Sequence, residues 1–99
     1  MNREQLLQVV LEVVRYAQDR IPDICQIEVT GSTRPLEDID KFDSKRWPTV
    51  RDLIALRLGV SLKGDNIFRA GRSTPRTIEE IVDHLSNVLR RPSTTRAAA

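Results

Sequence analysis

Two adjacent side chains, Asp43 and Ser44, lie where a loop-like segment meets a segment with helical periodicity. A serine or aspartate at that point can cap a helix. On residue types alone, Ser44 is a cap or a turn residue.

The other reactive residue types show no catalytic spacing. His84 is the only histidine, and no serine or cysteine has a recognisable base close to it in the sequence. Cys25 is the only cysteine, which excludes a disulfide framework, and its aliphatic neighbours predict that it is buried. A carboxylate cluster could bind a cation, but its spacing matches no calcium loop. The cluster comprises Glu37, Asp38, Asp40 and Asp43. We therefore expect a non-catalytic protein without a metal site.

Length and composition predict a small globular protein. A chain of 99 residues suits one domain, and 39% hydrophobic with 30% charged residues is ordinary for one. Only four aromatic residues are present, so the core must be aliphatic. The charged, amphipathic start does not resemble a signal peptide, and no apolar run reaches membrane-spanning length. We expect a cytoplasmic monomer that does not bind membranes.

Hydrophobic spacing predicts three main helices. The first has apolar residues at spacings of three and four and should stop near Arg20, because Pro22 disfavours helix before it. These apolar residues are Leu6, Val10, Val13, Val14 and Ala17. Residues 22–43 form a long connection, in which 26–30 is extended but has no partner strand. Its aliphatic residues could pin it to the core; they are Ile24, Ile27, Val29, Leu36 and Ile39.

The second helix ends at Gly59, but its start is ambiguous. It could be capped at Ser44, or it could begin near Pro48, with a weak capping box at residues 49–52. A short helix is expected at Ile67–Phe68, burying Phe68. The last helix opens with a capping box at residues 77–80. Its apolar face comprises Ile78, Ile81, Val82, Leu85, Val88 and Leu89.

These elements predict an all-α fold. It is a small four-helix bundle with three main helices, one short helix and a long first loop. We assign residues 1–90 to one helical domain and residues 91–99 to a disordered tail.

The charge of the chain is unevenly distributed. The net charge is only +2, but residues 45–76 hold eight bases and two acids, whereas residues 1–44 hold five bases and nine acids. A basic segment of this kind suggests an anionic partner, although each base alone could be an ordinary solvated side chain.

The region from Leu36 to Leu85 resembles the acyl carrier protein family, including the peptidyl carrier domains. The resemblance rests on Asp43-Ser44 before the second helix, Leu58-Gly-Val-Ser-Leu62 at its end, and Thr77-Ile-Glu at the start of the last helix. It implies a helical bundle of acyl-carrier type. It also implies 4'-phosphopantetheine attached to Ser44, with Asp43 as its motif neighbour. The phosphodiester would lie at or near a helix start, where free N–H groups and the helix dipole favour negative charge.

Further expectations follow from the resemblance. A separate phosphopantetheinyl transferase would modify Ser44. The arm would then hold an acyl or aminoacyl group for loading and accepting enzymes of lipid or secondary-metabolite biosynthesis.

The chain departs from the family pattern in three ways. Lys45 replaces the usual leucine, and Pro48 lies in the expected first turns. The normally acidic helix carries Arg51 and Arg57, with only Asp52 opposing them. These departures predict a specialised carrier with partners of its own. We expect Trp47 beside them to pack the loop on the helix rather than to contact a partner.

The alternative function is a small basic module, without a prosthetic group, that binds nucleic acid or another protein. Its phosphate contacts would be Arg57, Lys63, Arg69, Arg72 and Arg76. Nucleic acid is the less expected partner, because these bases are scattered through loops and not gathered on one recognition helix.

Overall fold

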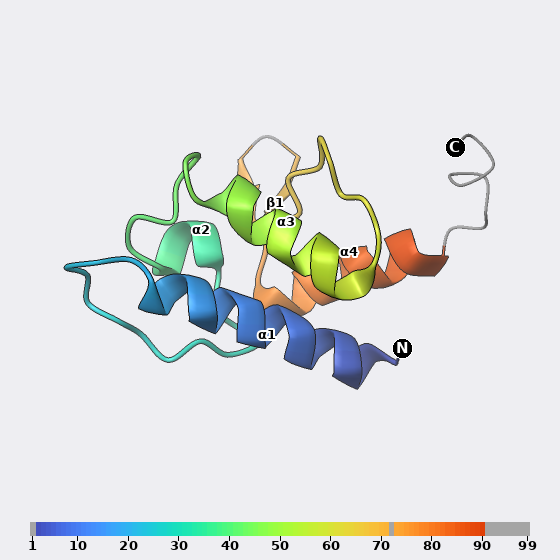
Figure 1. Cartoon of the computed structure of the whole chain (residues 1–99), viewed down its shortest axis with the longest axis horizontal. Coiled ribbons are helices and arrows are strands. Elements are labelled where there is room, and N and C mark those ends of the chain that lie inside the picture. Colours follow the sequence, from blue (N-terminus) through green and yellow to red (C-terminus); the bar gives the residue numbers. More distant parts are fainter. Residues whose placement is uncertain (1, 72, 91–99) are drawn as a thin grey trace.

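The computed structural model describes residues 2–71 and 73–90. The chain runs through helices α1 (Arg3–Asp19), α2 (Pro35–Asp38) and α3 (Trp47–Leu58), strands β1 (Arg69–Ala70) and β2 (Thr74–Pro75), and helix α4 (Ile78–Arg90). Helices α3 and α4 both pack on α1 (Figure 1). Over these described residues the fold is therefore mainly helical, as predicted, with four helices and little strand. The predicted tail, residues 91–99, lies outside the described residues.

Helix α1 begins and ends for local reasons. Asn2 caps its start: the Asn2 side chain accepts the Gln5 N–H, and the Gln5 side chain accepts the Asn2 N–H. The predicted apolar face is buried along the whole helix. The helix ends at Asp19, and Arg20 is its C-cap, close to the predicted stop.

Helix α3 begins at Trp47, with Pro48 in the first turn. The start near Pro48 is therefore confirmed, and the alternative start at Ser44 is wrong. The predicted capping box at residues 49–52 is also wrong, because Arg46 is the N-cap and makes no side-chain cap. Gly59 ends the helix with φ of 69°, the left-handed conformation that glycine adopts without steric cost.

The long first connection is held at several points rather than merely pinned by apolar side chains. The Gln18 amide donates to the Ile27 carbonyl and accepts the Ile27 N–H, at 2.9 and 3.1 Å. At the far end, the N–H groups of Ile78 and Glu79 donate to the carbonyls of Thr33 and Gly31. The connection thus satisfies two of the N–H groups that the start of α4 would otherwise leave free.

Gly31 lies against the Glu79 side chain of α4. A Cβ atom at this position would lie only 2.8 Å from Cγ of Glu79. A larger residue here would therefore require the Glu79 side chain to move.

The short helix was predicted at the wrong place. Residues 67 and 68 form a turn, in which Asn66 Oδ1 accepts the Phe68 N–H, followed by a hairpin pairing Arg69 with Pro75. Ile67 and Phe68 are both completely buried, which a bend between packed elements achieves without a helix. The short helix is instead α2, where Pro35 fixes the first turn and Asp38 accepts the Arg34 N–H.

The predicted burial of Cys25 is also wrong, because Cys25 is exposed. The connection runs along the surface here, so Ile24 and Ile27 pack against the core while the residues between them face solvent.

Aromatic packing completes a core that is otherwise aliphatic. The rings of Phe42 and Phe68 meet edge to face with centroids 5.1 Å apart, and Trp47 meets Phe68 at 6.4 Å. These contacts hold the loop before α3, the start of α3 and the hairpin together. The predicted packing role of Trp47 is confirmed.

The predicted capping box at the start of α4 is confirmed. The Glu80 carboxylate accepts the Thr77 N–H at 2.8 Å, and the Thr77 hydroxyl accepts the Glu80 N–H at 3.1 Å. The bond from the Thr77 backbone lowers the pKa of Glu80 below its ordinary value of 4.5. The ionised carboxylate therefore contributes to the stability of the folded state.

The capping box gives the free energy of unfolding a pH dependence. A carboxyl with a depressed folded pKa stabilises the protein above its unfolded pKa, and this contribution is lost as pH falls through the folded pKa. We expect the difference in Tm between wild type and Glu80→Gln to shrink as pH falls from neutral to below about 4. Thermal melts followed by circular dichroism measure it. Glu28→Gln, at an exposed loop position, is the control. A difference in Tm that stays constant with pH would contradict the assignment.

Candidate functional site

The Asp43–Ser44 pair lies on the turn that leads into α3 (Figure 1). Asp43 organises this turn. Its carbonyl accepts the N–H groups of Arg46 and Trp47, both at 2.9 Å, and its Oδ1 accepts the Lys45 N–H at 3.0 Å. The aspartate therefore supplies the hydrogen bonds that fix the backbone on both sides of the serine.

Ser44 makes none of the contacts that a capping serine would make. Its side chain is exposed, and within residues 2–71 and 73–90 its hydroxyl has no hydrogen-bond partner. It also lies two residues before the N-cap Arg46, outside the helix itself. The turn thus presents a hydroxyl that its own fold does not use.

The environment of Ser44 is positive, but less through the helix than the sequence suggested. Pro48 has no N–H, and the Trp47 N–H is already bonded to Asp43, so the start of α3 offers few free donors. Lys45 is exposed and Arg46 is half-buried, and neither has an ion-pair partner in the described part of the chain. An anion at Ser44 would be attracted mainly by these two side chains.

The start of α3 behind the serine is well anchored. Arg51 lies over the Trp47 ring, with its guanidinium carbon 5.4 Å from the ring centre, and pairs with Asp52 at 3.0 Å. Trp47 itself packs against the core. The hydroxyl therefore projects from a turn whose next element is held in place.

His84 is paired in a way that the sequence did not predict. Its Nε2 lies 2.8 Å from Oδ2 of Asp65, which joins α4 to the connection after α3. No serine or cysteine among the described residues hydrogen-bonds to His84. This pair ties α4 to the connection after α3.

Two members of the acidic cluster accept hydrogen bonds from backbone N–H groups. Asp38 accepts the Arg34 N–H, and Asp43 holds the turn described above. No three histidine, cysteine, aspartate or glutamate side chains in the described ranges come together as metal ligands.

The bases of the alternative binding module are partly engaged inside the protein. Arg57 pairs with Glu12 at 2.9 Å, and Arg76 donates to the Ile67 carbonyl at 3.2 Å. Arg72 lies outside the described residues. Intramolecular contacts thus already use Arg57 and Arg76, and Arg69 is not free either.

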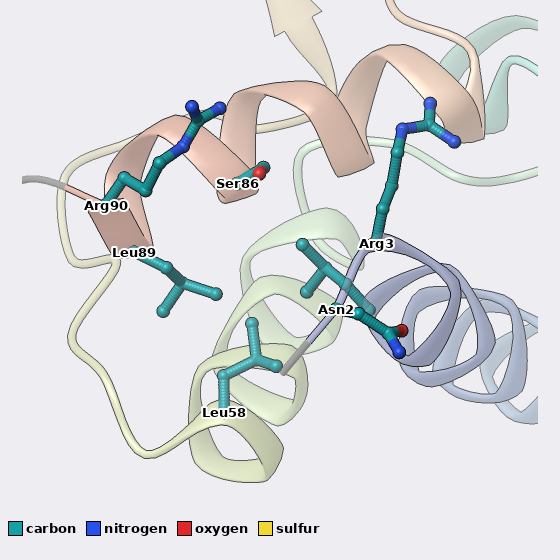
Figure 2. A pocket seen from close by; sticks show the side chains of 7 residues that line it. Asn2, Arg3, Leu58, Ser86, Leu89 and Arg90 are labelled. Carbon is teal, nitrogen blue, oxygen red and sulfur yellow. The ribbon is translucent and has the colours of Figure 1, made fainter.

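A groove of about 450 Å³ lies at the other end of α3 from Ser44. Figure 2 shows Leu58 and Leu89 pointing into it from α3 and α4. Arg3 borders the groove but is paired with Asp83 at 3.0 Å, so its charge is committed to α4. The groove brings no reactive side chains together.

Comparison with known proteins gives no further guidance, because no family model, curated protein or solved structure matches the chain. None of the described helices is both long and apolar enough to cross a membrane. A functional assignment must therefore rest on the geometry around Ser44.

Proposed function

We propose that the protein is a carrier that holds an acyl or aminoacyl group on a 4'-phosphopantetheine arm attached to Ser44. In the loading step, Oγ of Ser44 attacks the phosphorus of coenzyme A that bears the pantetheine. The bond from that phosphorus to 3',5'-ADP breaks. A separate phosphopantetheinyl transferase takes the serine proton and binds the leaving group. The thiol of the arm then holds the carried group as a thioester.

The observation that carries this proposal is the exposed hydroxyl of Ser44, which has no hydrogen-bond partner among the described residues. A carrier serine must be accessible to a transferase but need not be activated, because the transferase supplies the base. Asp43, and not Ser44, makes the hydrogen bonds that hold the turn before α3. The positive charges of Lys45 and Arg46 would favour the phosphodiester that forms.

The arrangement of helices supports the proposal in part. The long first helix, long connection, helix after the serine and last helix occur in the expected order. The short helix does not, because α2 precedes α3 and a hairpin stands where the short helix was expected. A carrier fold of this chain would therefore be an atypical one.

Intact mass spectrometry tests the proposal. We expect the purified protein, incubated with coenzyme A and a broad-specificity phosphopantetheinyl transferase, to gain the mass of one phosphopantetheinyl group. Peptide mapping should locate it on Ser44. A protein that stays unmodified under conditions that fully load a standard carrier would overturn the assignment.

The basic residues near Ser44 imply dedicated partners. Carriers of fatty acid synthesis dock through acidic helices in the family that this chain resembles, whereas the segment from residue 45 to residue 76 is basic. We therefore expect little binding to standard fatty-acid synthase enzymes, measured by calorimetry at low and high salt. A standard carrier serves as the positive control. Tight, salt-sensitive binding would contradict a specialised role.

Under the same proposal, we expect the protein to be a cytoplasmic monomer whose partners are acyl-loading and acyl-accepting enzymes. The alternative, a basic binding module without a prosthetic group, would instead bind nucleic acid in a salt-dependent gel shift.

A further inference from the structure

A second feature near Ser44 is a groove between the last turns of α1 and the first turns of α3. Its volume is about 320 Å³, at the small end of the range for small-molecule sites. It is lined by Tyr16, Ala17, Arg20, Ile21, Lys45, Arg46, Thr49, Val50 and Leu53. Ala17, Ile21 and Val50 are buried core residues, so the floor of the groove is apolar.

The mouth of the groove is positive. Arg20, Lys45 and Arg46 line it, and none of its nine lining residues is acidic. The neighbouring carboxylate of Asp43 is bonded to the Lys45 N–H. Neither Lys45 nor Arg46 forms an ion pair with any described residue, and Arg20 lies 4.7 Å from the centre of the Tyr16 ring. Among residues 2–71 and 73–90, no ion pair neutralises these three side chains.

The lining residues set the size of the ligand. On α1 they run from Tyr16 to Ile21, which at a rise of 1.5 Å per residue is about 8 Å. An extended hydrocarbon chain of about seven carbons spans that length.

We propose that this groove binds a medium-chain aliphatic carboxylate. The carboxylate lies against Arg20, Lys45 and Arg46, and the chain lies on the apolar floor beside Leu53. This site does not require the arm, although its mouth includes Lys45, the residue that follows Ser44. It would recognise the acid itself, free or as the end of a carried group.

The experiment is a titration of the unmodified full-length protein, followed by amide chemical shifts in NMR. The probe is octanoate below its micelle concentration, with octanamide and acetate as neutral and chain-free controls. We expect shifts centred on residues 16–21 and 45–53 with a Kd of about 1 mM, typical of a ligand of this size. Octanamide and acetate should each bind several-fold more weakly.

Charge variants separate recognition from loss of folding. Lys45→Gln/Arg46→Gln should weaken octanoate binding about fivefold, whereas Lys63→Gln, at an exposed position outside the groove, should not. Lys45→Glu/Arg46→Glu should reverse the preference and bind octylammonium better than octanoate. Gaining the cationic ligand shows that the groove is still formed.

Three results would overturn the inference. They are equal binding of octanoate and octanamide, equal binding of octanoate and acetate, and undiminished octanoate binding by either double variant. All of these measurements use protein without an arm, so they succeed or fail independently of whether Ser44 is modified.

Discussion

Alanine at position 44 is expected to abolish the coenzyme A-dependent gain in mass completely. The substitution removes the only atom that the proposed loading reaction uses on this protein, so no residual rate is expected. The Ser44 side chain is exposed and its hydroxyl has no partner in the described structure, so stability should change by less than about 0.5 kcal/mol. Intact mass spectrometry and a thermal melt of the same sample measure both quantities.

Ser61→Ala is the matched control, because Ser61 is also an exposed serine next to α3, beyond its other end. It should load as wild type does. If Ser44→Ala still gained the mass, or if Ser61→Ala lost it, attachment at Ser44 would be refuted. An unfolded Ser44→Ala protein would refute the claim that the hydroxyl has no structural role.

Phe68→Ala is expected to lower the free energy of unfolding by about 3–5 kcal/mol. Phe68 is 0% exposed and is the shared partner of the Phe42 and Trp47 rings. Removing it leaves a cavity and loses both edge-to-face contacts at once. Since small domains are stable by only about 5–15 kcal/mol, a large part of the stability would be lost. Urea denaturation followed by circular dichroism measures the change.

Leu56→Ala is the control for shortening an apolar side chain that is not buried. Leu56 lies in α3 but is 78% exposed, so its truncation should cost less than about 0.5 kcal/mol. Comparable losses for the two variants would show that Phe68 does not organise the core. Phe68→Leu, which retains most of the volume, should fall between them.

The parts of the fold that the sequence predicted are those specified locally. The spacing of apolar residues located α1 and α4, since one buried face repeats every three or four residues in each. Gly59 and the box at Thr77 marked helix ends by chemistry that acts within a few residues. Pro48 likewise set the start of α3.

The errors concern segments whose structure depends on distant partners. Cys25 is exposed because of the path of its connection, and hydrogen bonds to Gln18 and to the start of α4 fix that path. The turn at Phe68 depends on rings from two other segments. These distant contacts produce no pattern of apolar residues around Cys25 or Phe68 in the sequence.

The candidate site was likewise predictable only in part. The sequence drew attention to Ser44, but not to the exposure of its hydroxyl or to Asp43 taking over the hydrogen bonds of the turn. The groove could not be foreseen, because Tyr16 and Arg20 meet residues of α3 only through the packing of two helices.

The bonds from α4 to the carbonyls of Gly31 and Thr33 have a mechanical consequence. The first turn of α4 cannot separate from the long connection without breaking both hydrogen bonds. The connection, although it is almost all irregular backbone, is therefore fixed to the bundle at its far end. Because Gln18 holds the connection near its start, the connection links the end of α1 to the beginning of α4.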